Sequence, residues 1–114
     1  MGYLSYVQII ETTLPVADVD VPEWSGKVQV RAITTAEVAK ARRTATNPRT
    51  KDLDELRFNA YIVVVGCVDP EFPPEGADQL IRKAAAGAVA RIAAVIVELS
   101  GLGEDDEDDD QGEA

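Results

Sequence analysis

The stretch that decides the fold runs from Val19 to Glu37 and reads VDVPEWSGKVQVRAITTAE. Apolar and polar residues alternate on both sides of its Pro-Glu-Trp-Ser-Gly turn, and this period-2 pattern predicts a half-buried β-hairpin. Pro22 fixes φ at the start of the turn, and we expect Gly26 to take a positive φ before the return strand. Thr34 and Glu37 have the spacing of a capping box, which predicts the start of a helix. The stretch therefore predicts a hairpin that leads directly into a helix.

Two further capping boxes, Ser5 with Gln8 and Asp52 with Glu55, predict a short helix over about 6–12 and a longer one that ends near Gly66. Residues 61–65, YIVVV, are β-branched apart from the first, and on propensity alone they could form a buried strand. Their apolar spacing of three and four residues continues from the helix start, so we predict that they are helical.

The remaining helices are predicted from their caps and from proline. The helix after Thr34 should end near residue 45, before Asn47-Pro48, and the proline-rich segment 69–74 should be a link. Beyond it we expect helices over about 78–85 and 88–100, with Gly87 as the break or close-packing point and Gly101 as a left-handed cap. The sequence thus predicts a small α+β domain over 1–103, in which a short helix and a hairpin precede three or four helices.

The residue types argue against an enzyme. The chain contains no histidine, which removes the commonest general base and a common metal ligand. Cys67 lies in an apolar run and is interpreted as a buried structural thiol. Asp52, Asp54 and Glu55 could be imagined as a metal site, but acids at a helix start are better explained by the helix dipole. We therefore predict no catalytic residue, no metal and no cofactor.

The formal net charge of −10 belongs mainly to the last eleven residues, EDDEDDDQGEA. Such a run of like charges repels itself and has nothing to bury, so we predict that 104–114 is a disordered tail that aids solubility. The apolar run 84–97 is interrupted by Arg91 and is shorter than the roughly 20 residues that a bilayer requires, so we expect a soluble protein without membrane contact.

Three features are candidate partner-binding surfaces. Trp24 at the hairpin tip is interpreted either as a lid over the core or as an exposed anchor. Arg42 and Arg43 belong to a basic cluster that could receive acidic groups; nucleic acid is disfavoured because the rest of the chain is nearly neutral and the acidic tail would compete. The C-terminal helix carries an apolar stripe that could contact another subunit or a client protein; its members are Val89, Ile92 and Ile96.

The segments YLSYVQIIE, VPEWSGKVQVRAITTAE, LRFNAYIVVVGCVDPEF and VIVELSGLGE together resemble the tail assembly chaperones of long-tailed, siphovirus-type bacteriophages. The resemblance covers nearly all of residues 3–103. Its most specific elements are the Pro22-Glu-Trp24-x-Gly26 turn with the following Val28-x-Val30-Arg31, and the ending Glu98-Leu-Ser-Gly-Leu102. None of these elements is an enzymatic signature.

The resemblance implies a non-enzymatic protein of the host cytoplasm that is absent from the mature virion. It implies binding to the aggregation-prone tape measure protein, assistance to the major tail tube protein, and homo-oligomers. Two alternatives remain: a tail or connector subunit that is retained in the virion, and a small nucleic-acid-binding regulator.

Overall fold

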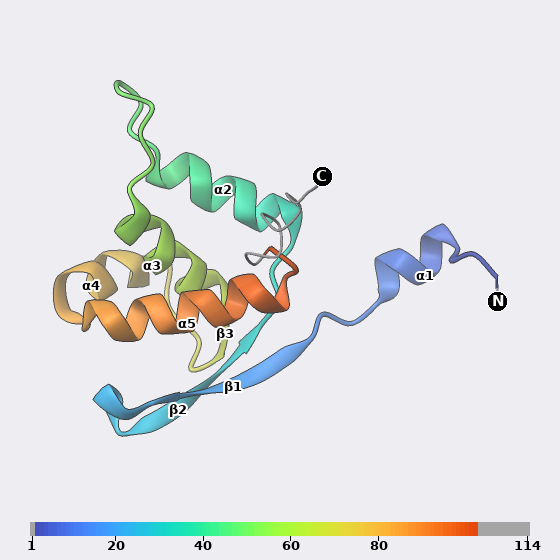
Figure 1. Ribbon diagram of the computed structural model, residues 1–114, viewed down its shortest axis with the longest axis horizontal. Coiled ribbons are helices and arrows are strands. Elements are labelled where there is room, and N and C mark those ends of the chain that lie inside the picture. The colour runs from blue at the N-terminus through green and yellow to red at the C-terminus, as the bar shows by residue number, and fades with distance from the viewer. Residues whose placement is uncertain (1, 103–114) are drawn as a thin grey trace, which may run out of the picture.

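The computed structural model describes residues 2–102, and Figure 1 shows their arrangement. The elements follow in the order α1 (Tyr6–Glu11), β1 (Val16–Val21), the 3-10 turn η1 (Pro22–Trp24), β2 (Gly26–Arg31), α2 (Thr35–Ala45), α3 (Glu55–Gly66), β3 (Cys67–Asp69), α4 (Gly76–Lys83) and α5 (Ala86–Leu99). The predicted α+β fold is confirmed: a short helix and a hairpin precede four helices. The tail that we predict to be disordered, 104–114, lies outside the described residues.

The hairpin alternates as predicted. Val19 pairs with Val28 and Ala17 with Val30, and the inward-facing valines of both strands are buried. A third strand, β3, was not predicted; it adds to the sheet antiparallel to β2, with Cys67 opposite Val30. Only three residues form it, immediately after α3, so the apolar pattern of the helix conceals it in the sequence.

Helix α3 lies at the centre of the helical layer. It packs against α2, α4 and α5, while α5 also covers the hairpin (Figure 1). Helices α3 and α5 pack tightly at Gly66, where a Cβ atom would stand 2.6 Å from Cδ1 of the fully buried Ile96. Glycine is therefore required at this position by the packing of the two helices.

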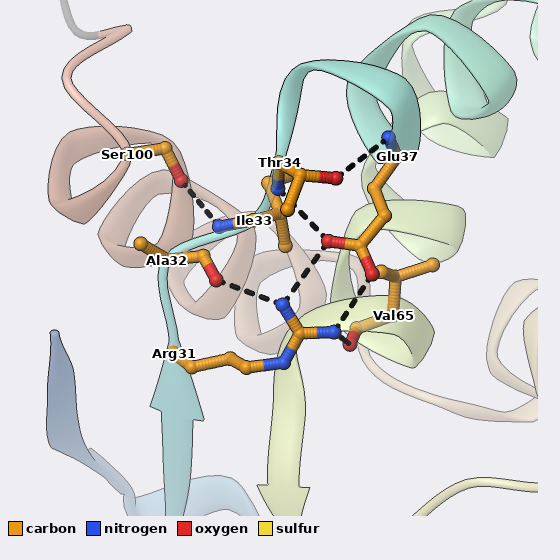
Figure 2. Close-up of polar contacts among 7 residues, drawn as sticks. All are labelled: Arg31, Ala32, Ile33, Thr34, Glu37, Val65 and Ser100. Atoms are coloured by element: carbon orange, nitrogen blue, oxygen red, sulfur yellow. Dashed lines mark hydrogen bonds and ion pairs between the residues drawn. The ribbon is translucent and has the colours of Figure 1, made fainter. Parts of the chain in front are cut away.

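Arg31, at the end of β2, joins three elements (Figure 2). Its guanidinium donates to both carboxylate oxygens of Glu37 at 3.0 and 2.9 Å, and to the carbonyl oxygens of Ala32 at 2.9 Å and Val65 at 3.1 Å. Glu37 also accepts from the Thr34 N–H at 2.9 Å and completes the predicted capping box of α2. One arginine thus connects β2 to the start of α2 and the end of α3.

The helix ends follow the sequence in most places. Helix α1 has the predicted Ser5–Gln8 capping box, residues 61–65 are helical, and Gly101 takes φ +78. The N–H groups of Gly101 and Leu102 donate to the carbonyls of Glu98 and Val97, which is the hydrogen-bond pattern of a Schellman motif.

The predicted cap of α3 is wrong by two residues. The N-cap is Asp54, whose carboxylate accepts from the Arg57 N–H at 3.2 Å, rather than Asp52. A β-bridge between Thr46 and Leu53 holds the chain extended just before the helix, so the helix cannot begin earlier.

Two glycines do not act as predicted. In the hairpin turn the positive φ belongs to Ser25, at +56, because the residue after the 3-10 turn η1 is its left-handed cap, and Gly26 already belongs to β2. The break between α4 and α5 lies at Ala84 and Ala85, both extended, and Gly87 is inside α5 with no atom within 4 Å of its ideal Cβ position.

Candidate partner-binding surfaces

The apolar stripe of α5 is part of the core. Ile92 and Ile96 are fully buried and Val89 is nearly so, because α5 lies between the hairpin and α3. The expectation that Ile92 and Ile96 contact a partner is therefore corrected: in this fold their side chains are already covered. Val89 is 7% exposed and also lines an apolar hollow between α3, α4 and α5. An apolar stripe indicates a buried face, and here the chain itself supplies the cover.

Trp24 lies at the hairpin tip and is 37% exposed. Its neighbour Glu23 receives a two-pronged hydrogen bond from the guanidinium of Arg91, at 2.8 and 2.9 Å, which fastens the tip to α5. This contact lowers the pKa of Glu23 from 4.5 to about 2, chiefly through the Arg91 hydrogen bonds. Trp24 is thus partly packed against the body and partly exposed at the hairpin tip.

Arg42 and Arg43 are both exposed, in the last turn of α2. The Arg42 guanidinium lies 5.7 Å from the centroid of the Phe58 ring, which is within the range of a cation–π contact and connects α2 to α3. Arg57, a further basic residue in α3, has guanidinium nitrogens 3.8 Å from the carboxylates of Asp54 and of Asp78. Part of the basic cluster therefore serves the fold.

An apolar hollow opens between α3, α4 and α5, and sequence reasoning did not find it. Seven of its eight lining residues are apolar. The residues that form this hollow are Leu56, Asn59, Ala60, Leu80, Ile81, Ala84, Ala86 and Val89. Leu56 is 65% exposed and Ile81 is 40% exposed. Leu56 belongs to the series of apolar residues, spaced three and four apart, that predicted α3. This spacing does not show that Leu56 stays exposed while the other residues of the series are packed more closely.

The N-terminal arm, residues 2–14, is the second apolar surface that the sequence did not reveal. Figure 1 shows it extending away from the rest of the chain, on the side opposite α4. No residue of α1 is buried. The large apolar side chains that the arm leaves exposed are Tyr3, Leu4, Tyr6, Val7, Ile9, Ile10 and Leu14.

The described residues offer little for catalysis. Within 2–102 no group of three or more Asp, Glu or Cys side chains is placed to hold a metal ion. Burial raises the pKa of the Cys67 thiol to about 11, so the predicted buried cysteine is confirmed and its thiol is a poor nucleophile at neutral pH. None of the helices in this part of the chain is long and apolar enough to cross a membrane.

Comparisons of the chain with protein-family models, with curated proteins and with solved structures found no match. The described residues by themselves define a small α+β domain with two exposed apolar surfaces, the hollow and the arm.

Proposed function

We propose that this chain is a tail assembly chaperone of a long-tailed bacteriophage. It binds apolar helical segments of the tape measure protein in the host cytoplasm, keeps them from aggregating while tail tube subunits assemble, and does not remain in the virion. The proposal is supported by the resemblance of the four sequence segments and by the surfaces of the folded chain.

The observation that carries the proposal is the hollow between α3, α4 and α5. Leu56 and Ile81 expose apolar side chains around a small concave surface, whose lining residues are apolar except for Asn59. Grooves of this kind accept the apolar face of an amphipathic helix, with side chains spaced three and four residues apart as anchors. Trp24, Arg42 and Arg43 remain exposed elsewhere on the body and could extend the contact to a long client.

Co-expression with the tape measure protein of the same phage tests the proposal. The client should become soluble and co-purify with the wild-type chain. Leu56→Asp should reduce this effect, because it places a charge in the hollow. An acid in the first turn of α3 is compatible with the helix dipole, so the fold should survive.

Val68→Asp is the matched control, since Val68 is 39% exposed on β3 and is not among the residues of the hollow. A client that stays equally insoluble with and without the chain would contradict the chaperone function. Mass spectrometry of purified virions distinguishes the chaperone from the alternative function, because a retained tail or connector subunit would be found in the particles.

A further inference from the structure

We infer that the acidic tail, residues 104–114, binds the chain's own helix α2 at Arg42 and Arg43, so that an acidic partner must displace the tail before it can use this surface. The inference concerns one chain alone and does not depend on the proposed function.

The described part of the chain ends beside α2. Ile33, just before α2, donates its N–H to Oγ of Ser100 at 2.9 Å, and this bond fixes the end of α5 next to the start of α2 (Figures 1 and 2). Leu102, the last described residue, lines a surface cleft together with Arg42. The acidic tail therefore begins on the side of α2 that carries Arg42.

The face of α2 that lines this cleft is basic at its far end. Arg42 is the last of four residues on this face that have the spacing i, i+3, i+4, i+7, and Arg43 lies at the edge of the same face. The four residues with this spacing are Thr35, Val38, Ala39 and Arg42. The cation–π contact of Arg42 with Phe58 leaves the positive charge in place. Two cationic groups thus lie along the path on which the tail begins.

Arg42 and Arg43 lack acidic partners within residues 2–102. Both side chains are exposed, and neither forms an ion pair in this part of the chain. The sequence from Thr34 to Lys51 contains five bases and one acid, Glu37, whose carboxylate is already bonded to Arg31. The positive charge of this surface is therefore not balanced by its own segment.

The tail has the complementary charge and sufficient length. Residues 104–114 contain eight acids and no base. Arg43 lies eight residues beyond Thr35, which corresponds to about 12 Å of helix. The first five residues after Leu102 span up to about 17 Å when extended. A single exposed ion pair contributes little, but eight carboxylates attached to the same chain meet the two guanidinium groups at a high effective concentration. Such a contact needs no fixed conformation of the tail.

A second exposed basic pair, Arg82 and Lys83, is a matched control. These residues end α4, which lies at the opposite end of α5 from Leu102 (Figure 1). Helix α5 has 14 residues and is therefore about 21 Å long. The first four acids of the tail cannot cross this distance, so the tail should prefer Arg42 and Arg43.

Paramagnetic relaxation NMR on the full chain tests the inference. A nitroxide is attached at Gln111→Cys, which keeps all eight acids of the tail, whereas the native Cys67 thiol is buried and stays unmodified. The label should broaden the amide signals of residues 39–43. The broadening should fall about threefold in Arg42→Gln/Arg43→Gln, because two exposed charge pairs are lost. It should also fall in the wild type in 1 M salt, where charges are screened beyond about 3 Å.

Two control variants show whether the position of the charges matters. Arg82→Gln/Lys83→Gln removes the same charge from α4 and should leave the broadening of residues 39–43 unchanged. A chain whose eight tail acids are replaced by the corresponding amides should show the weak broadening of Arg42→Gln/Arg43→Gln.

Three results would overturn the inference. Equal broadening in the wild type and in Arg42→Gln/Arg43→Gln would show that the tail only samples the space near Leu102. An equal loss in Arg82→Gln/Lys83→Gln would show that the tail responds to net charge alone. Finally, an isotopically labelled chain without the nitroxide is mixed with a nitroxide-carrying chain at natural isotope abundance. Broadening of residues 39–43 in this mixture, as strong as within one chain, would place the tail on a neighbouring copy instead.

Discussion

Replacing Arg31 by methionine should cost the fold about 2–3 kcal/mol. The change keeps an unbranched side chain that reaches as far as the Nε position but removes the four hydrogen bonds of the guanidinium, two to the Glu37 carboxylate and two to the carbonyls of Ala32 and Val65. Hydrogen bonds to charged groups contribute about 1.5–3 kcal/mol each when they are well buried. The side chains of Arg31 and Glu37 remain 28% and 31% exposed, so water replaces part of what is lost and the sum is reduced accordingly.

Urea unfolding followed by circular dichroism measures this cost, and the melting temperature should fall by roughly 10–20 °C. Lys27→Met is the control, because the Lys27–Asp18 pair is mostly exposed and 3.6 Å apart, and its loss should cost no more than about 0.5 kcal/mol. A double-mutant cycle with Glu37→Gln, which retains the capping box, should give a coupling energy of about 1–2 kcal/mol. A cost below about 0.5 kcal/mol for Arg31→Met would refute the view that this residue joins the sheet to the helices.

The same pair has a definite pH dependence. The Arg31 hydrogen bonds are the largest cause that lowers the pKa of Glu37 below its usual 4.5. A carboxylate with a lowered pKa in the folded state stabilises the fold above the unfolded value, and the stabilisation is lost as the pH falls through the folded value. The difference in stability between wild type and Glu37→Gln should therefore be largest near pH 6 and should shrink below about pH 4.5.

Four further substitutions have definite expected outcomes. Gly66→Ala should destabilise by about 1–3 kcal/mol, because its Cβ would overlap Ile96, whereas Gly87→Ala, in open space within α5, should stabilise by about 0.5–1 kcal/mol; the two denaturation midpoints must move in opposite directions. Trp24→Ala should cost about 1–2 kcal/mol in urea unfolding, less than the loss of a fully buried tryptophan, because the ring is partly exposed already, and a cost of 4 kcal/mol would show that the ring is a lid over the core. Arg91→Met should return the pKa of Glu23 from about 2 towards 4.5 in an NMR titration, and an unchanged pKa would show that Arg91 does not hold the hairpin tip in solution.

Much of the fold could be predicted because local chemistry determines it. The Ser5 and Thr34 caps begin helices where predicted, and Gly101 ends α5 with the expected left-handed cap. Side-chain oxygens that bond to backbone N–H groups a few residues away need no tertiary information. Two features depend on contacts between residues that the local pattern does not relate to each other: the β-bridge that sets the start of α3, and the pairing of β3 with β2. The sequence pattern did not predict either of them.

The candidate site could not be predicted in the same way, because a stripe of apolar residues does not show what covers it. The stripes of α5 and α1 have the same helical spacing, yet Ile92 is fully buried and Ile10 is 64% exposed. The difference comes from the connections. Helix α5 follows α4 after two extended residues and packs on α3, whereas α1 is joined to the body only through four residues and the edge strand β1. A short tether at an edge strand thus leaves the apolar helix α1 uncovered by the rest of the described residues, although its spacing is the same as that of the buried helix.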